Sequence, residues 1–579
     1  MPWKGRETVA PGERSEPGVW IKEREGALKG RQKRAQDRQS VAPAAAGALL
    51  GGDDIPRAAL GLPGATVLPP PGGFLKPPAL RAVVNCSSTY HGDWIVNLKS
   101  ADEISEAVGG RKLSAVEVAR AALGRIDAAD STLRAFLTVE PERVLARARE
   151  VDRQVADGGS RLPLAGVPVA VKDNICTRGL RTTCASKILE NYVPPYSATA
   201  IERLERAGVV IVGKTNCDEF AMGSSTENSA FQITRNPYDL DRVAGGSSGG
   251  SAVAVAAGMA TLALGSETGG SVRQPASFCN VLGLKPTYGR ISRYGLVAFA
   301  SSLDNIGLFA ASPRDMAALL SVIAGRDEHD ATSAPVPVPD YPREMDRPAA
   351  GMRLGIPKEY FGGGLDADVK AIIDTALQNA RSLGCDLVEV SLPHTEYAIA
   401  DYYIIAPAEA SSNLARYDAV RYGFRVPHPQ NLLEMYKCSR SAGFGAEVKR
   451  RIMIGTYALS SGYYEAYYGR AMRVRTLIKR DFEEAFEKVD ALLTPVSPTP
   501  AFRIGEKIDD PLSMYLSDIY TVTANLAGTP ALSLPCGFTP SGLPVGLQII
   551  GHQFQEGTVL RLASAYYEAF PVPGPSLKA

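Results

Sequence analysis

The sequence of 579 residues lacks an excess of charge of either sign, and it lacks any long apolar run. Lys and Arg number 63 and Asp and Glu number 62, so the formal net charge is only +1. This balance provides no general electrostatic attraction to nucleic acid. Any contact with RNA is therefore expected to be made by a partner protein. No run reaches the roughly 18 apolar residues of a membrane helix, so no membrane span is expected.

Paired cysteines are missing as well. The eight cysteines never form a C-x-x-C pair, which argues against a zinc site and for reduced, buried thiols in a reducing compartment. We also expect no ATP-binding loop of the G-x-x-x-x-G-K-[ST] type. The chain itself is therefore expected to hold no metal and no cofactor.

Histidine is scarce, and its distribution directs the search for a catalytic base. A serine hydroxyl becomes a strong nucleophile only when a neighbour takes its proton, and histidine is the usual neighbour. None of the five histidines lies between Leu162 and Ala310, where glycine, serine and lysine motifs cluster. Distant histidines can fold back, so the distribution favours another base without excluding histidine.

Residues 245–273 hold two glycine- and serine-rich loops around one short apolar element. Glycine lets successive backbone N–H groups point into one cavity, which suits an oxyanion. We predict a buried helix over 251–260, a short strand over 261–265 and a second helix over 272–278. Ser271 would then stand at a helix start, placed for nucleophilic attack with backbone dipoles stabilising the charge. The alternative is that Ser271 is a helix N-cap and that the glycines form ordinary turns.

Lys172 ends an apolar segment, residues 166–171, that we expect to form a buried strand. A lysine in that place can lose its charge by desolvation and act as a base, although a lysine that reaches solvent is the commoner case. Residues 245–249 fit the G-x-S-x-G nucleophile pattern, but that motif needs a preceding strand and residues 236–242 are polar and turn-like. Lysine is therefore the favoured base.

Three motifs together resemble the amidase signature family, whose Ser-Ser-Lys triad hydrolyses amides: the strand-end Lys172, the run 245–251 and the segment 268–271. The resemblance implies that Ser271 forms the acyl ester, that Ser247 relays charge from a cis peptide, and that Lys172 is the base. It also implies an oxyanion hole made by the backbone N–H groups of Thr268, Gly269 and Gly270.

Other charged residues near these motifs have two possible roles. Residues 214–225 resemble the family loop that reaches the substrate pocket, although Lys214 or Asp218 could equally be surface charges. Lys285 and Arg290 are expected to form ion pairs under the sheet rather than to take part in catalysis.

Strands alternate with helices after about residue 160, which predicts an α/β fold. The resemblance implies a central mixed β-sheet flanked by helices, with a helical insertion at about 399–487 in the C-terminal half. Strands expected after residue 350 continue the same sheet, so we predict one domain over 91–579. Residues 100–151 are expected to be helical, with Ser114 as an N-cap and one face formed by Val116, Ala119, Leu123 and Ile126.

Residues 1–90 differ from the rest because Pro, Gly, Ala and Arg crowd them without sustained periodicity. We predict a disordered extension that acts as an organelle presequence, for import into the chloroplast stroma or the mitochondrial matrix. Its acidic residues are many for a transit peptide, so a disordered tail or an incorrectly assigned start is the alternative.

Segments of the second half resemble the A subunits of tRNA-dependent amidotransferases, a branch of the same family. These segments are residues 410–418, 448–452, 460–464 and 514–520. Free glutamine as the ammonia donor carries an α-carboxylate and an α-ammonium, so its pocket should offer one cation and one anion. By motif position Arg451 is the cation, Asp518 is the anion and Tyr402 lies near the substrate. Arg450 is expected at the surface, and the alternative for Asp518 is an N-cap or an exposed acid.

The implied function is release of ammonia from glutamine by Ser271, followed by hydrolysis of the γ-glutamyl ester. The resemblance also implies a heterotrimer with a B subunit, which binds tRNA and uses ATP with Mg²⁺, and a small C subunit. Together they would convert Glu-tRNA(Gln) to Gln-tRNA(Gln), with the tRNA contacted mainly through the partner. Two alternatives stay open: a stand-alone amidase for small or fatty amides, and a catalytically silent assembly scaffold.

Overall fold

The computed structural model describes residues 100–158, 162–573 and 577. The predicted presequence over residues 1–90 lies outside the described residues and stays a prediction.

The described strands form a single sheet of eleven, in the order β1-β3-β2-β4-β6-β5-β10-β11-β9-β7-β8. They are β1 (Phe136–Thr138), β2 (Pro168–Lys172), β3 (Val210–Thr215), β4 (Leu262–Glu267), β5 (Leu282–Lys285), β6 (Asn305–Ala310), β7 (Arg353–Pro357), β8 (Asp386–Val390), β9 (Ala491–Pro495), β10 (Ala531–Phe538) and β11 (Pro544–Gly551). Strand β2 pairs in parallel with β3 and β4, and β7 pairs in parallel with β8 and β9, whereas the other neighbours are antiparallel. The predicted mixed sheet is confirmed, and so is its continuation after residue 350.

Helices flank this sheet along the whole described chain. They are α2 (Ala101–Gly109), α3 (Ala115–Leu133), α4 (Pro141–Ala156), α5 (Thr199–Arg206), α6 (Gly249–Ala256), α7 (Arg273–Phe278), α8 (Pro313–Ile323), α9 (Tyr341–Met345), α10 (Ala367–Ser382), α11 (Ala398–Asn413), α12 (Leu432–Gly443), α13 (Ala446–Ala458), α14 (Tyr468–Phe486), α15 (Pro511–Tyr515), α16 (Val522–Ala527) and α17 (Glu556–Ala569). None of the described helices has both the length and the apolar character that crossing a membrane requires.

The first helices begin at serine caps. Ser114 accepts a hydrogen bond from the Glu117 amide and donates its own amide to the Glu117 carboxylate, which confirms the predicted N-cap of α3. The prediction of helix throughout 100–151 is wrong where β1 intervenes, because pairing with β3 overrides local propensity. The predicted face of α3 is also only partly right: Val116 and Leu123 are half-buried, and the buried residues are Ala115, Val118, Ala119, Ala122, Ile126 and Leu133.

Three parallel strands bring the predicted motifs to one edge of the sheet. Strands β2, β3 and β4 all point the same way, so their carboxyl ends lie together. The predicted helix–strand–helix order of residues 251–278 is confirmed as α6, β4 and α7, with bounds shifted by a few residues. The last residues of β2 and β4 are buried, which places Lys172 and Glu267 inside the protein.

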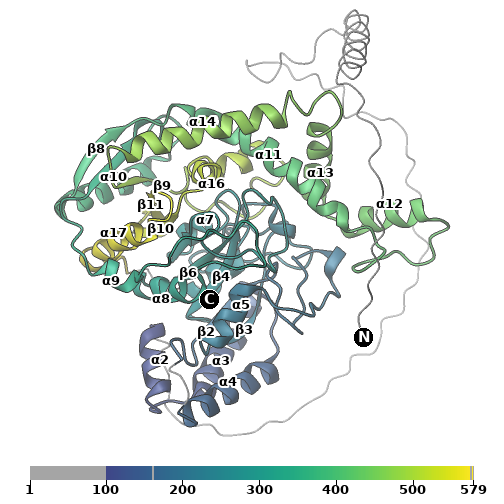
Figure 1. The fold of residues 1–579 in the computed structure, drawn as a ribbon, viewed down its shortest axis with the longest axis horizontal. Coiled ribbons are helices and arrows are strands. Elements are labelled where there is room, and N and C mark those ends of the chain that lie inside the picture. Colours follow the sequence, from purple (N-terminus) through teal and green to yellow (C-terminus); the bar gives the residue numbers. More distant parts are fainter. Residues whose placement is uncertain (1–99, 159–161, 574–576, 578–579) are drawn as a thin grey trace, which may run out of the picture. The chain divides into compact units, whose positions relative to one another are not determined.

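The chain between β8 and β9 folds into α11, α12, α13 and α14. Figure 1 shows α11, α13 and α12 following one another away from the sheet, with α14 beside α11. Apolar residues of α11, α14 and α16 form a second buried cluster next to the main core, and Tyr402 belongs to it. The strand residues of this cluster come from β8, β9, β10 and β11, so the cluster packs α11 against that part of the sheet.

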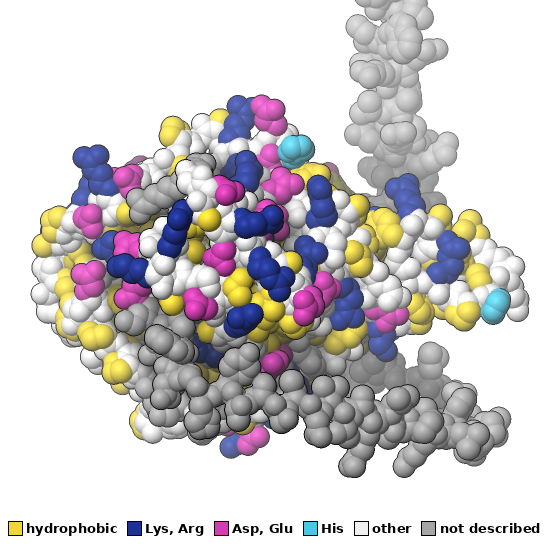
Figure 2. Space-filling model, turned by 90° about the horizontal axis from the view of Figure 1, so that it is seen from below, with side chains coloured by type: hydrophobic (Ala, Val, Ile, Leu, Met, Phe, Trp, Pro, Cys, Tyr) yellow, Lys and Arg dark blue, Asp and Glu magenta, His cyan; other side chains and the backbone are white. Residues whose placement is uncertain are grey.

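Basic and acidic side chains alternate on the face of the protein seen from below (Figure 2). No broad region of one sign stands out there, in keeping with the net charge of +1.

Candidate active site

Lys172 is the fully buried last residue of β2, and its ammonium group is bound by two serines. The Nζ atom donates to Ser247 Oγ at 2.7 Å, to Ser248 Oγ at 2.8 Å and to the Ser266 carbonyl oxygen at 3.1 Å. The alternative in which Lys172 reaches solvent is therefore wrong. The sequence motifs did not single out Ser248, although it stands next to Ser247 in the same glycine-rich loop.

Burial lowers the pKa of Lys172 from 10.5 to about 8, against the opposing charges of Cys217, Asp218, Glu267 and Asp304. A base with such a pKa is partly neutral near physiological pH. Lys172 can therefore accept a proton where an ordinary surface lysine could not.

Ser247 follows a cis peptide bond with Gly246, as the resemblance implied. The position of Gly246 excludes a side chain, because an added Cβ would lie 2.6 Å from the Ser225 amide nitrogen and still closer to the Asp218 carboxylate. The Asp218 amide donates to the Ser247 carbonyl oxygen at 3.2 Å, which ties this loop to the end of β3.

Ser271 lies at the end of the second loop, just before α7, and is 8% exposed. Its carbonyl oxygen accepts from the Ser248 amide at 3.1 Å, so the backbones of the two loops are joined. Within the described residues its hydroxyl forms no hydrogen bond with Ser247 or another group. The N-cap of α7 is Val272, so the alternative role of Ser271 as a helix cap is wrong.

The segment 268–270 presents backbone N–H groups beside Ser271. None of these three amides has a hydrogen-bond acceptor within the part of the chain that the structure describes. Gly269 lies against Tyr402, where an added Cβ would stand 2.9 Å from the ring, and its carbonyl oxygen accepts from Thr521 Oγ1 at 2.6 Å. The free amides can therefore serve an oxyanion at the place that the resemblance implied.

A buried ion pair holds the helix that follows Ser271. The guanidinium of Arg273 binds the carboxylate of Glu267, and both groups are inaccessible to solvent. Glu267 also accepts from the amides of Val272 and Arg273 at 2.9 and 3.2 Å. Sequence reasoning missed this pair, although the spacing of six residues across the second loop could have indicated it.

Tyr402 and Asp518 border the oxyanion segment. Tyr402 is buried on α11, and its hydroxyl lies 2.7 Å from Thr268 Oγ1. Asp518 is 6% exposed, and its Oδ2 accepts from Ser224 Oγ at 2.6 Å. Its Oδ1 has no partner within the described residues, and this atom would lie 3.2 Å from a Cβ added to Gly270. Burial raises the pKa of Asp518 to about 7, and the alternatives of an N-cap or an exposed acid are wrong.

Arg451 is buried on α13 and is surrounded by aromatic rings. Its guanidinium carbon lies 5.3 Å from the ring centre of Tyr403 and 5.4 Å from that of Tyr515. Its Nε donates to Glu447 Oε1 at 2.8 Å, while the two terminal nitrogens have no hydrogen-bond acceptor among the described residues. Arg450, as predicted, is turned outward, with a side chain 44% exposed.

Lys214 near the end of β3 and Asp218 just after this strand are both buried, so the surface-charge alternative for these two residues is wrong. Contrary to expectation, residues 208–215 do fit the letters G-x-x-x-x-G-K-T. Residues 210–215 of this segment form β3 rather than a phosphate loop. Lys214 Nζ donates to the Ile175 carbonyl oxygen and to Thr182 Oγ1. A phosphate loop needs open amides between a strand and a helix, and this segment does not provide them.

Lys285 and Arg290 were expected to form ion pairs under the sheet, and of these two residues Arg290 does so. Arg290 forms a buried pair with Glu556, which confirms the prediction for that residue. Lys285 instead donates to the Pro286 carbonyl oxygen, and burial lowers its pKa to about 7.

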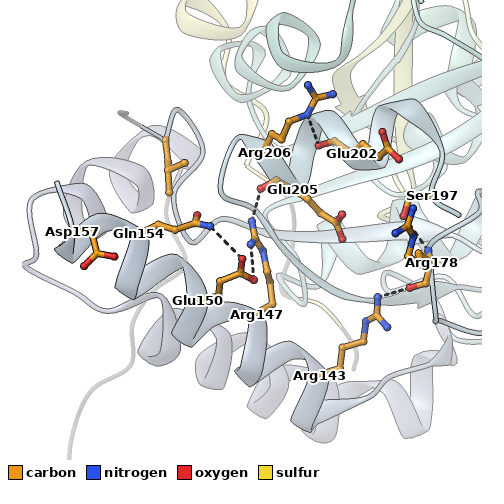
Figure 3. Close-up of a pocket in the computed structure, with 11 residues that line it drawn as sticks. Arg143, Arg147, Glu150, Gln154, Asp157, Arg178, Ser197, Glu202, Glu205 and Arg206 are labelled. Atoms are coloured by element: carbon orange, nitrogen blue, oxygen red, sulfur yellow. Dashed lines mark hydrogen bonds and ion pairs between the residues drawn. The ribbon is translucent and has the colours of Figure 1, made fainter. Parts of the chain in front are cut away.

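A separate hollow of about 830 Å³ lies along α4 and α5, and Figure 3 shows its lining. Arg147 in this hollow forms an ion pair with Glu150 and donates to the Glu205 carbonyl oxygen. Its guanidinium therefore already has partners within the protein. No residue predicted for catalysis or glutamine binding lines this hollow. The site at the ends of β2 and β4 is therefore the candidate active site.

Comparisons with known proteins agree with this geometry. Residues 117–560 match the amidase family. The chain is 61% identical over 467 residues to the A subunit of the glutamyl-tRNA(Gln) amidotransferase of Carboxydothermus hydrogenoformans, in a match that covers 81% of this chain and 96% of the relative. It is 58% identical to the corresponding protein of Koribacter versatilis, over 82% of this chain and 99% of that one. The crystal structure of the Thermotoga maritima protein of the same name matches with a TM-score of 0.69 at 46% identity, over 83% of this chain and 98% of that chain. The chain belongs to the amidase family and, within it, to the glutamyl-tRNA(Gln) amidotransferase A subunits.

Proposed function

We propose that this chain is the glutamine amidohydrolase subunit of a tRNA-dependent amidotransferase, and that it releases ammonia for partner subunits. The observation that carries the proposal is the unpaired Oδ1 of Asp518 beside Gly270. A buried carboxylate oxygen without a partner is unfavourable unless a cation binds it. The α-ammonium of glutamine is such a cation, and the free terminal nitrogens of Arg451 suit the α-carboxylate.

The proposed reaction begins with neutral Lys172, which takes a proton through Ser247 from the hydroxyl of Ser271. Ser271 Oγ attacks the side-chain amide carbon of glutamine, and the oxyanion meets the free amides of residues 268–270. The C–N bond then breaks, and the leaving nitrogen receives the proton back through Ser247. Water hydrolyses the γ-glutamyl ester by the same relay, which releases glutamate and restores Ser271.

Ammonia release from glutamine by the purified chain, alone and with its partners, tests this function. Ser271→Ala should reduce the rate to background, whereas Ser301→Ala, an exposed serine outside the site, should leave it unchanged. Glutamine hydrolysis that survives Ser271→Ala would contradict the mechanism and would agree with the scaffold alternative. Faster hydrolysis of small aliphatic or fatty amides than of glutamine would favour the stand-alone amidase, which has no use for Asp518 and Arg451.

The proposed partners are a B subunit, which binds tRNA and uses ATP with Mg²⁺, and a small C subunit, in a heterotrimer. The balanced net charge and the absence of an open phosphate loop at residues 208–215 support leaving tRNA and ATP to a partner. Gln-tRNA(Gln) formation that needs all three proteins would support the assembly, and formation by this chain alone would contradict it.

We also propose that the protein works in the chloroplast stroma or the mitochondrial matrix. The support is the composition of residues 1–90, which is crowded with Pro, Gly, Ala and Arg. A fluorescent protein fused behind these residues should enter one of the two organelles, and a cytosolic signal would contradict the proposal.

A further inference from the structure

The segment 218–228, which follows β3, contacts both sides of the active site. On the glutamine side, Ser224 Oγ donates to Asp518 Oδ2 at 2.6 Å. On the catalytic side, the Ser224 carbonyl oxygen accepts from Gln274 Nε2, and Gln274 Oε1 accepts from the Gly246 amide, both at 2.9 Å. Ser224 therefore stands between the candidate anion and the loop that carries Ser247.

The hydrogen bond from Ser224 determines how the carboxylate of Asp518 is turned. The terminal torsion of an aspartate has broad minima, so the group is free to rotate unless a partner holds it. With Oδ2 held by Ser224, Oδ1 is left facing Gly270, where an added Cβ would be 3.2 Å away. The Ser224 hydroxyl thus directs the free oxygen of Asp518 toward the substrate position.

Glu219 supports the candidate cation, Arg451, by contacting the start of the helix that carries it. Its carboxylate accepts from the Gly445 amide at 2.8 Å and from the hydroxyl of Ser186. Gly445 is the N-cap of α13, and Glu219 accepts from its backbone amide, as the N3 carboxylate does in a capping box. The N3 residue here is Val448, which has no acceptor of its own, so Glu219 takes that role from another element. An added Cβ at Gly445 would collide with Glu219, which shows how closely the two elements meet.

The helix fixed in this way carries Arg451. In its first turn Glu447 accepts from Arg451 Nε at 2.8 Å, so the position of the guanidinium follows from the position of the start of α13. Buried side chains of one segment therefore support both charged groups at the glutamine site: Ser224 contacts Asp518, and Glu219 contacts the start of the helix that carries Arg451.

We propose that Ser224 and Glu219 are positioning residues that set the specificity for glutamine. Ser224 orients Asp518 for the α-ammonium, and Glu219 holds Arg451 for the α-carboxylate. The inference rests on the proposed function, because it presumes that Asp518 and Arg451 bind those two groups. It goes further because it assigns recognition of each charged group of glutamine to a different residue of the segment 218–228.

Substrate analogues that lack one of the two charged groups of glutamine distinguish the role of Ser224 from that of Glu219. Glutaramate lacks the α-ammonium, and 4-aminobutanamide lacks the α-carboxylate, whereas both keep the reactive amide. We would measure kcat and KM for glutamine and both analogues with the full chain and its partners, at about pH 8, where Asp518 and Glu219, whose pKa values burial raises to about 7, are ionised.

Ser224→Ala should lower kcat/KM for glutamine about tenfold, mainly through KM, and should leave glutaramate unchanged, because only the ammonium contact is lost. Ser224→Thr keeps the hydroxyl and should restore the preference. Ser225→Ala is the matched control, since Ser225 is buried in the same segment but its hydroxyl accepts from the Glu227 amide.

Glu219→Ala should lower kcat/KM for glutamine and for glutaramate by a similar factor and should spare 4-aminobutanamide, with Glu219→Gln close to wild type. An equal loss for all three substrates in either alanine variant, or an unchanged ratio of glutamine to glutaramate in Ser224→Ala, would overturn the inference. If the wild-type protein itself shows no preference for glutamine over either analogue, the proposed function fails instead.

Discussion

Replacing Asp518 by Asn should stabilise the substrate-free protein and at the same time weaken its binding of glutamine. Asp518 is 6% exposed, and burial raises the pKa of its carboxyl to about 7 although the hydroxyl of Ser224 lowers it. Ionised Asp518 is therefore unfavourable in the folded protein. Asparagine has the same shape, and its amide oxygen can still accept from Ser224 without carrying a charge.

The size of this effect follows from linkage between protonation and folding. The folded-state pKa of Asp518 is above the unfolded value of 3.8, so the stability of the wild-type protein falls as pH rises from about 3.8 to about 7. Each pKa unit corresponds to about 1.4 kcal/mol, so the loss above pH 7 is about 4 kcal/mol. At about pH 5 only a third of this loss is present. The free energy of unfolding of Asp518→Asn, relative to that of the wild type, should therefore increase by about 3 kcal/mol between about pH 5 and about pH 8.

Urea unfolding of both proteins at the two pH values measures this difference. Asp509→Asn, which changes an exposed acid just before α15, is the control and should change stability little at either pH. In glutamine hydrolysis, Asp518→Asn should raise KM on the order of 100-fold, because a buried charge pair with the α-ammonium is lost. A variant that is less stable than wild type at both pH values, or an advantage that does not grow with pH, would refute the reasoning.

The remaining predictions concern the relay and the oxyanion segment. Initial rates of ammonia release should give a kcat/KM that rises about tenfold between about pH 7 and about pH 9, because burial lowers the pKa of Lys172 to about 8 and the neutral form grows over that range; a flat profile would contradict a lysine base. Lys172→Arg should reduce kcat by at least about 1,000-fold, because a guanidinium stays protonated, and a rate near wild type would exclude Lys172 as the base. Ser248→Ala, which removes one of three partners of the Lys172 ammonium, should lower kcat about tenfold, and an unchanged kcat would show that this contact is dispensable. Tyr402→Phe, which removes the contact with Thr268, should lower kcat about fivefold and change KM less; the reverse pattern would assign Tyr402 to substrate binding alone.

Local sequence patterns predicted the catalytic loops because their chemistry is local. Lys172 ends an apolar strand, and a charge at that point needs an explanation within the fold. Residues 245–251 and 268–271 combine glycines with hydroxyls, a composition that favours close backbone approach over core packing. Both observations could be made without any knowledge of distant parts of the chain.

The glutamine side of the site depends on contacts that no local pattern reveals. Ser224 and Asp518 are separated by 294 residues, and Glu219 and Gly445 by 226. Arg451 and Asp518 could be selected only through resemblance to a family. Ser224 and Glu219 lie in the segment 214–225 that resembles the family's substrate-pocket loop, but the sequence did not single out either residue.

Small errors in the predicted elements have the same origin. Strand β1 has only three residues and exists because it pairs with β3, so no periodicity could indicate it. The apolar residues of α3 lie on more than one side of the helix, because α3 packs both against the sheet and against α4. Tertiary packing decided both outcomes.

The most direct test of the central claim is to find the residue that carries the γ-glutamyl group during turnover. The protein would be mixed with glutamine, quenched in acid and digested, and the modified peptide would be identified by mass spectrometry. Our account predicts an ester on Ser271 that accumulates in wild type and is absent from Ser271→Ala. A glutamyl adduct on any other residue, or glutamine turnover that continues in Ser271→Ala, would contradict it.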